Sequence, residues 1–388
     1  MKSGEFFRQA RRSGMWPGAE AVHRSALTKA RRKIGWQVFR DIFDRAVLLA
    51  YECWPKRSQF LWHGMSVFAI DGSKFTLPAS QEIRDEFDPK SGLQHSGKGH
   101  FPICLVSTVY DVFRRLPIAR TVVPVDSSER EEAKELLPHI PALSVLLYDR
   151  GYPSFELISH LREHFNGFFI FRCPAQSTFS AVQKFVKSGK TEATVRITPS
   201  SKFLSKIPLT HRNGVKPIKL RVVRLESPDG TVSVLLTNLY NKKRFPGEEI
   251  INLYFRRWEV ESYYRDEKVV LELESFHSKT CNGIRQELFA AMIMSVISRT
   301  LMQLSVQTFL DDSRELQFKN TIMTLASDAA VLAPDDPERA IVIFDEILEE
   351  ISRVIYYRPK KPRASQPRVT KRSRNKWIDA KGRKMANA

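Results

Sequence analysis

Cysteine is scarce in this sequence, and no cysteine lies near another. The four residues are Cys53, Cys104, Cys173 and Cys281. Their spacing contains no CxxC pair, which excludes a zinc ribbon or a thioredoxin-like redox motif. Isolated thiols of this kind fit a reducing compartment. The nine histidines show no ligand pair at the H-E-x-x-H spacing, so the sequence predicts no catalytic zinc site.

Long uncharged apolar runs are also missing. The first residues, MKSGEFFRQARRSG, contain no apolar core of the length that a signal peptide needs. The most apolar helix candidate, residues 288–310, is interrupted by Arg299, and its uncharged opening over residues 288–298 is too short to span a bilayer. We therefore expect a cytoplasmic protein without a membrane anchor.

Positive charge, by contrast, is abundant and concentrated at the two ends of the chain. The formal net charge is +19. Residues 1–40 contain ten Lys and Arg against two acids, and residues 358–388 contain twelve against one. The long stretch between them is close to neutral. Basic ends attract phosphates without sequence preference, so the pattern favours a nucleic-acid partner over a merely solubilising tail.

The spacing of apolar residues predicts an α/β architecture in the first half of the chain. Helical periodicity covers residues 25–50. Beyond it the order is three strands, helix, strand, helix, strand, at residues 67–70, 101–112, 116–125, 127–137, 143–148, 154–165 and 168–171. The continuous apolar runs are typical of strands buried on both faces. The expected fold is a mixed sheet flanked by helices.

The pattern changes after residue 173. Over residues 174–240 helical periodicity disappears, and strand-like runs at 194–197, 218–225 and 232–236 are separated by turn residues, which predicts a β-rich insertion. Helices resume at Gly247 and continue to about Val354. From Pro359 onward the chain is basic and aperiodic, which predicts a flexible tail.

Two aspartates lie where apolar runs end. Asp71 is in FAIDGSKF, and Asp149 is in LLYDRGY. An Asp in such a position is more often a turn residue than a catalyst. Neither aspartate is therefore informative by itself.

A third acid lies in a predicted helix with the sequence LYFRRWEVESYYRDEKVV. At about 100° of rotation per residue, Tyr254, Arg257, Glu261 and Lys268 fall within about 60° of one another. One helix face would then carry a phenol, a guanidinium, a carboxylate and an ammonium group. A solvated, salt-bridged face is the alternative, because Arg257 and Glu261 are an i,i+4 pair. Trp258, beside this face, is expected in the core.

Phosphodiester chemistry gives a reason for this combination of side chains. In-line attack is commonly assisted by two divalent ions. Mg²⁺ is held by a few carboxylates together with substrate phosphates. Acids from two strand ends and one helix can meet although they are distant in sequence, and cations on the same helix face would bind the flanking phosphates. Tyr254 would add a hydroxyl contact or stack on a base.

The spacing Tyr254-x2-Arg257-x3-Glu261-x6-Lys268 matches the YREK signature, and on it the chain resembles bacterial insertion-sequence transposases of family four, which are of the DDE type. Four further stretches resemble that family: ALTKARRK at 26–33, FAIDGS around Asp71, YDRGY around Asp149 and TNL at 237–239. The resemblance covers roughly residues 25–310 and the basic tail.

This resemblance implies a ribonuclease H-like catalytic core. The implied metal-binding and catalytic acids are Asp71, Asp149 and Glu261, with Mg²⁺ as the cofactor and Mn²⁺ as its substitute. The implied DNA-binding residues are Tyr254, Arg257 and Lys268. The reaction would be cutting of double-stranded DNA at terminal inverted repeats, followed by joining of the 3′ ends to target DNA. Because two ends are cut together, we expect a homodimer in the DNA complex.

The resemblance also assigns the segments of the chain. They are a basic helical DNA-binding region (1–60), the catalytic core in two parts (61–173 and 241–310), the β-strand insertion (174–240), C-terminal helices that are candidates for dimerisation (311–357) and the basic tail (358–388). Two alternatives stay open: a decayed or domesticated DNA-binding protein without catalysis, and a nuclease that cuts without joining. A binding protein has little use for grouped acids, because acids near DNA cost affinity unless a metal neutralises them.

Overall fold

The structure is a computed structural model that describes residues 22–54, 58–90, 101–212, 214–226, 230–310, 314–328 and 337–356, and the single positions 8, 11, 18 and 20. The tail predicted over residues 358–388 lies outside the described residues. The chain divides into two compact units. The sheet unit comprises residues 44–76 and 83–265, and the helical unit comprises residues 1–43, 77–82 and 266–388.

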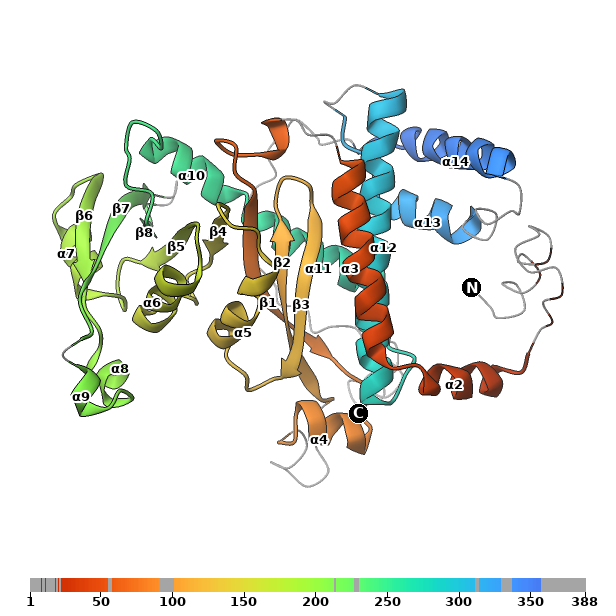
Figure 1. The fold of residues 1–388 in the computed structure, drawn as a ribbon, viewed down its shortest axis with the longest axis horizontal. Coiled ribbons are helices and arrows are strands. Elements are labelled where there is room, and N and C mark those ends of the chain that lie inside the picture. The colour runs from red at the N-terminus through yellow and green to blue at the C-terminus, as the bar shows by residue number, and fades with distance from the viewer. Residues whose placement is uncertain are drawn as a thin grey trace, which may run out of the picture. The chain divides into compact units, whose positions relative to one another are not determined.

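The sheet unit is built on one eight-stranded sheet with the order β3-β2-β1-β4-β5-β8-β7-β6 (Figure 1). The strands are β1 Val67–Thr76, β2 Ile103–Asp111, β3 Leu116–Pro124, β4 Val145–Tyr148, β5 Phe168–Pro174, β6 Glu192–Ile197, β7 Ile218–Glu226 and β8 Val232–Thr237. β1 pairs antiparallel with β2 but parallel with β4, and β4 pairs parallel with β5. This mixed sheet confirms the α/β class, a mixed sheet flanked by helices, that the sequence predicts.

Helices flank this sheet (Figure 1). They are α4 Gln81–Phe87, α5 Glu129–Glu135, α6 Phe155–His164, α7 Ser180–Lys187, α8 Ser201–Ser205, α9 Leu209–Arg212, α10 Gly247–Phe255 and α11 Trp258–Val269, with short 3₁₀ turns at Ser58–Phe60 and Leu137–His139. α6 begins where the Ser154 hydroxyl accepts a hydrogen bond from the Leu157 N–H, and it buries an apolar face. All four residues of β4 are buried, as its continuous apolar run predicts.

The stretch 174–240 differs from the prediction in two respects. Its strands β6, β7 and β8 extend the main sheet, because β8 pairs antiparallel with β5. It also contains helices, of which α7 buries Val182 and Phe185. Two apolar residues three apart on an eight-residue helix leave too little periodicity to be recognised in the sequence. That the stretch acts as a separable insertion stays a prediction.

The helical unit contains α2 Arg24–Lys33, the first part of α3 Trp36–Cys53, α12 Cys281–Phe309, α13 Phe318–Asp328 and α14 Pro337–Ser352. The single helix expected over residues 25–50 is therefore wrong, because the chain breaks between α2 and α3. Ile34 is extended there, and its carbonyl accepts a hydrogen bond from the Asn282 side chain at 2.9 Å. This long-range contact has no local signal.

Helix α12 is long and apolar enough to cross a membrane by length and composition. More than half of its most apolar window is buried inside the protein. Its second half packs with α13 and α14 into an apolar core that includes Leu301, Leu325 and Leu348. These contacts make α12 the central core helix of the helical unit.

Candidate active site

Asp71 and Asp149 lie side by side at the centre of the sheet. Ile70 of β1 pairs with Tyr148 of β4 in parallel register; Asp71 is the next residue of β1, and Asp149 directly follows the end of β4. Neighbouring strands are about 4.8 Å apart, so the two acids are neighbours although 78 positions separate them. The prediction that two strand-end acids meet therefore agrees with the register of the sheet.

The sequence allowed both aspartates to be turn residues at the ends of strands. This is wrong for Asp71 and correct for the backbone of Asp149. β1 does not end at Asp71, because the following residues continue to pair with β2, Gly72 opposite Ser107. At Asp149 the chain does turn, and the Tyr152 N–H donates to the Asp149 carbonyl at 3.1 Å. Arg130 of α5 fixes this turn by donating to the Gly151 carbonyl at 2.8 and 3.0 Å.

Helix α11 brings Glu261 to the same strand. The Tyr264 hydroxyl lies 2.8 Å from the carbonyl oxygen of Asp71 and 3.1 Å from that of Val106, so it donates to β1 and β2. Glu261 is three residues earlier, about one helical turn. The hydroxyl contact thus fixes the helix that carries the third acid beside the strand that carries the first.

The electrostatics of Asp71 reflect this gathering of acids. Its pKa is raised from 3.8 to about 7. Burial is the largest cause, the positive charge of Arg257 opposes it, and the negative charges of Asp149, Glu129 and Glu261 add to it. Without a bound cation, Asp71 is therefore partly protonated near neutral pH.

The positive charge of Arg257 acts on this group of acids. Its side chain is only 2% exposed, and its Nη2 donates to Glu261 Oε1 at 2.7 Å. Its pKa is raised although burial lowers it, because Tyr254, Glu261 and the two aspartates favour the charged form. Its Nε and Nη1 have no hydrogen-bond acceptor within the described part of the chain. These N–H groups are buried beside Tyr254 and the acids, which makes the Arg257 guanidinium part of the same charged cluster.

The continuous helix predicted from Tyr254 to Lys268 is wrong. α10 ends at Phe255 and α11 begins at Trp258, and the backbone between them makes i→i+3 hydrogen bonds, such as Arg257 N–H to the Tyr254 carbonyl. Such bonds close turns of about three residues, so the uniform 100° rotation does not hold there. The solvated-face alternative is also wrong for Tyr254 and Arg257, because both are buried.

The other residues of the predicted face differ from one another. Trp258, expected in the core, is 40% exposed, and the Arg257 guanidinium lies 5.1 Å from the centre of its ring. Burial, as the largest cause, raises the pKa of Tyr254 to about 12, so its hydroxyl keeps its proton. Lys268 follows on α11 in the helical unit, with its Nζ 3.8 Å from Glu274 Oε1.

Glu129 is a residue of this site that sequence reasoning missed. It is the first residue of α5, and its side chain lies against Gly72. A Cβ placed on Gly72 would be 2.8 Å from the Glu129 Cδ and 2.9 Å from its Cγ. In the sequence, Glu129 is one of several acids in SSEREEAKELL that suit a helix N-terminus. No local signal separates it from them.

In the part of the chain that the structure describes, no three His, Cys, Asp or Glu side chains are grouped so as to hold a metal ion. Asp71, Asp149 and Glu261 therefore do not form a closed metal cage as they stand. Two adjacent aspartates still suit Mg²⁺, which binds one or two carboxylates and completes its shell with water and substrate phosphates. The donor set of the site is thus compatible with a divalent cation.

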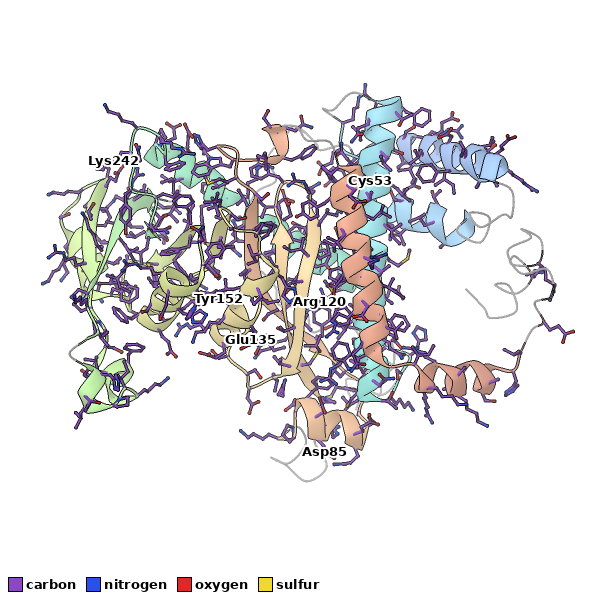
Figure 2. The ribbon with its side chains drawn as sticks, viewed as in Figure 1. Cys53, Asp85, Arg120, Glu135, Tyr152 and Lys242 are labelled. Carbon is purple, nitrogen blue, oxygen red and sulfur yellow. The ribbon has the colours of Figure 1, made fainter. Side chains whose placement is uncertain are left out.

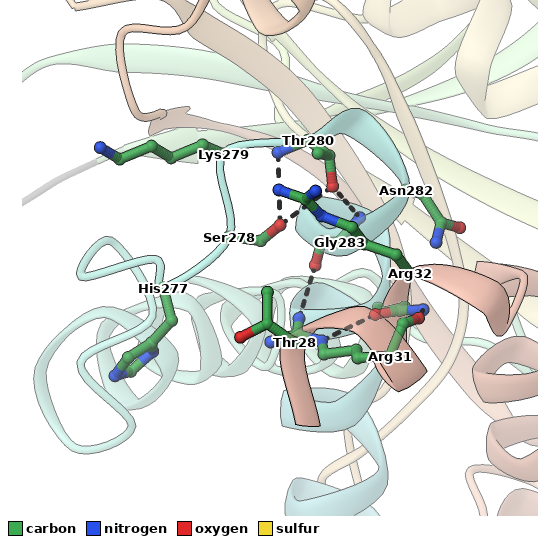
Figure 3. Close-up of a pocket in the computed structure, with 10 residues that line it drawn as sticks. Thr28, Arg31, Arg32, His277, Ser278, Lys279, Thr280, Asn282 and Gly283 are labelled. Carbon is green, nitrogen blue, oxygen red and sulfur yellow. Dashed lines mark hydrogen bonds between the residues drawn. The ribbon is translucent and has the colours of Figure 1, made fainter. Parts of the chain in front are cut away.

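A separate cavity of about 310 Å³ lies in the helical unit between α2 and the start of α12 (Figure 3). Arg31 is anchored there by Gln286 and by an ion pair with Glu287, both at 2.8 Å. Arg32 and Lys279 also line the cavity. Its lining carries cations rather than grouped carboxylates, so it is not a candidate for metal-assisted hydrolysis.

A model of the transposase DDE domain family matches residues 62–297. The chain is 28% identical over 286 residues to the transposase InsG for insertion sequence element IS4 of Escherichia coli, which covers 72% of this chain and 61% of that protein. It is 31% identical over 167 residues to the putative transposase y4zB of Sinorhizobium fredii, covering 41% of this chain and 43% of that protein. The chain therefore spans about three fifths of the first relative's length and less than half of the second's.

Among solved structures, the cryo-EM structure of a piggyBac transposase synaptic complex with hairpin DNA is similar to this chain with a TM-score of 0.42 and 12% sequence identity. The alignment covers 89% of this chain and 67% of that chain.

Proposed function

Because the chain belongs to the transposase DDE domain family, we propose that it cuts DNA at the terminal inverted repeats of an insertion sequence and joins the freed 3′ ends to target DNA. The observation that supports this proposal is that Asp71 of β1 and Asp149, just after the end of the adjacent parallel strand β4, are brought close together, and that α11 carries Glu261 to the same strand. Acids of this kind on a shared strand edge suit phosphodiester chemistry.

The proposed catalytic acids are Asp71, Asp149 and Glu261, which would hold Mg²⁺, or Mn²⁺ in its place. When bound, the divalent ions supply activation of the attacking oxygen and stabilisation of the leaving oxygen. The protein contributes the position of the carboxylates. Glu261 is held by the charge-assisted hydrogen bond from Arg257, and Asp71 is held by its pairing within β1 and β2.

Tyr254, Arg257 and Lys268 are the proposed DNA contacts, as in the YREK signature. Arg257 and Tyr254 lie side by side, with the positive charge of Arg257 acting on the Tyr254 hydroxyl, which keeps its proton, so together they would present donors to phosphate oxygens. Since Arg257 is buried, we expect the exposed Trp258 over its guanidinium to move when a phosphate approaches. Arg257 would then hold Glu261 and the DNA together.

The proposed partners are double-stranded DNA and a second copy of the chain. Two transposon ends must be cut together, which requires two active sites. In the segment 311–357, Ile341 and Val342 of α14 are exposed apolar residues and mark a candidate dimer surface. We place the protein in the bacterial cytoplasm, where its DNA substrate is.

The test is a cutting assay with Mg²⁺ on duplexes that carry the element's own inverted repeats. Wild type should nick these duplexes and join the 3′ ends to a plasmid, and Glu261→Gln should abolish both steps. Glu248→Gln, an exposed acid of α10, is the matched control and should keep full activity. If Glu261→Gln nicks these duplexes as fast as wild type, the catalytic role of Glu261 is wrong. Nicking without joining would indicate the nuclease alternative, and binding without either would indicate a non-catalytic protein.

A further inference from the structure

The cavity between α2 and the loop that leads into α12 is lined by positive charge (Figure 3). Its charged lining residues are Arg31, Arg32 and Lys279, and the exposed ring of His277 also borders it. Among the described residues, no Asp or Glu lines it. Its volume of about 310 Å³ exceeds by far the roughly 10–15 Å³ that one water molecule needs. The cavity therefore has room for an anion of several heavy atoms.

Arg31 uses its charge inside the protein, where it fixes α2 against α12. It donates to Gln286 Oε1 at 2.8 Å, to the Gly283 carbonyl at 3.0 Å and to Glu287 Oε1 at 2.8 Å. Gln286, which is only 1% exposed, donates in return to the Arg31 carbonyl at 3.2 Å. Because these contacts are partly or fully buried, they give one wall of the cavity a fixed shape.

The opposite wall is held by the same glutamate. Glu287 accepts hydrogen bonds from the N–H groups of His277 and Ser278, at 2.9 and 3.0 Å. The Ser278 hydroxyl is seated against Gly283, where an added Cβ would overlap with it, so this position requires glycine. The loop that carries Lys279 is thus fixed on α12, the helix to which Arg31 also binds.

Arg32 and Lys279 are the cations of this cavity that the protein leaves without an acidic partner. Both side chains are exposed, and neither forms an ion pair with an acid in the part of the chain that the structure describes. α2 contains no acid, and the exposed Lys29 and Lys33 continue its positive surface outside the cavity (Figure 2). Two such cations from two walls of one cavity attract an anion.

The start of α12 does not itself supply the binding groups, because its first N–H groups are already used. The Thr280 N–H donates to Ser278 Oγ at 3.3 Å, and the Gly283 N–H donates to Thr280 Oγ1 at 3.2 Å. The Cys281 N–H donates to Glu82 Oε1 at 2.8 Å. Binding of an anion therefore depends on the side-chain cations, of which an arginine offers a planar set of donors that matches phosphate.

We propose that Arg32 and Lys279 bind a backbone phosphate of duplex DNA at this cavity, away from the cut site. DNA is favoured over a free anion because the positive charge extends beyond the cavity: residues 1–40 contain ten Lys and Arg against two acids, which a polyanion engages together. The inference rests on the proposed function, because it adds a contact to the same DNA substrate. Such a contact positions the duplex without reading its sequence.

The first test measures binding of the full chain to a random-sequence duplex by fluorescence anisotropy over a range of salt concentrations. Arg32→Gln and Lys279→Gln should each raise Kd about tenfold and make the dependence of log Kd on log salt shallower by about one unit. Lys33→Gln is the matched control, because it removes the same charge from a residue that is turned by about 100° from Arg32 and does not line the cavity. It should raise Kd less than about threefold. An unchanged urea midpoint checks that each variant is folded.

The second test locates the contact by acetylation of lysines followed by mass spectrometry. Lys279 and Lys33 are both exposed, so both react in the free protein. Duplex DNA should protect Lys279 more than Lys33, and inorganic phosphate at the same concentration of phosphate groups should protect neither. Equal protection of Lys279 by inorganic phosphate would show a site for a free anion and would overturn the assignment to DNA.

The proposal is also overturned if Lys33→Gln weakens binding as much as the two cavity variants do, or if DNA leaves Lys279 unprotected. If both cavity variants lose affinity while wild type cuts no transposon end, the inference stands and the proposed function fails. If wild type cuts transposon ends and the cavity variants bind DNA like Lys33→Gln, only the inference fails.

Discussion

Asp71 is a carboxyl group whose surroundings oppose its charge. Burial, Asp149, Glu129 and Glu261 raise its pKa to about 7, and Arg257 offsets only part of this. The folded state therefore binds this proton more tightly than the unfolded state, and stability is lost as the pH rises from about 4 to about 7. The rise from 3.8 to about 7 corresponds to about 4 kcal/mol at most. A site that is unfavourable when empty is suited to a cation that relieves it.

Replacing Asp71 by Asn should therefore stabilise the metal-free protein. We expect a gain of about 2–4 kcal/mol at pH 8, because Asn removes the buried charge, and a gain that fades as the pH falls towards 4. The measurement is urea unfolding in EDTA at several pH values. Asp126→Asn, an exposed acid near Lys90, is the control and should change stability little at any pH. A pH-independent difference for Asp71→Asn would contradict the environment described for this group.

At the scale of elements, a buried arginine joins the distal strands of the sheet to the segment that leads into α10. Arg221 of β7 is 1% exposed and makes two hydrogen bonds to Glu192 of β6. Its Nη1 also donates to the carbonyls of Leu239 and Phe245, at 2.9 and 2.7 Å. Because α10 carries Tyr254, this arginine helps to position one end of the active site.

Replacing Arg221 by Met should be costly, because the carbonyls of Leu239 and Phe245 lose their buried donor and the partly buried Glu192 keeps only Lys242 as a partner. We expect a loss of about 3–5 kcal/mol in the free energy of unfolding, measured by urea denaturation. Arg224→Met on the same strand is the matched control, since Arg224 makes one 3.2 Å hydrogen bond with the Val186 carbonyl and a 3.9 Å ion pair with the exposed Glu226, and is itself more exposed. An equal loss of unfolding free energy in both variants would show that the hydrogen bonds of Arg221 add no more stability than those of Arg224.

At the scale of the whole molecule, charge is distributed unevenly along the chain. The net charge of +19 resides in residues 1–40 and 358–388, whereas the stretch that forms the sheet is near neutral. Under the proposed function, attraction to the phosphate backbone and contact with the cut site would therefore fall to different parts of the chain. Phosphate contacts carry no sequence information, but they govern affinity and its dependence on salt.

Removing residues 358–388 should weaken binding to all DNA sequences alike and make the dependence of log Kd on log salt shallower. The measurement is fluorescence anisotropy on a transposon-end duplex and on a random duplex over a range of salt concentrations. Changing the twelve Lys and Arg of this segment to Gln should reproduce the effect of the deletion. A loss restricted to the transposon-end duplex would contradict a non-specific role.

The spacing of apolar residues predicted most helices and strands correctly, but it did not predict where one helix ends and the next begins. The buried run that forms β4 and the apolar face of α6 follow from the spacing of apolar residues. The breaks at Ile34 and between Phe255 and Trp258 do not, because they depend on hydrogen bonds and packing rather than on periodicity. The short helix α7 was missed for the related reason that eight residues contain too few repeats of the pattern.

The sequence by itself determined which residues are available for chemistry: two aspartates at apolar runs, the Tyr254–Lys268 pattern and basic ends. Only the tertiary structure decided which of them meet. The register of β1 on β4 makes Asp71 and Asp149 neighbours, and a slip of one residue would turn one of them to the other face. The Glu129 side chain of α5 lies against Gly72 of β1. Such contacts join residues far apart in the chain, so they are set by long-range pairing and packing, which local sequence patterns do not encode.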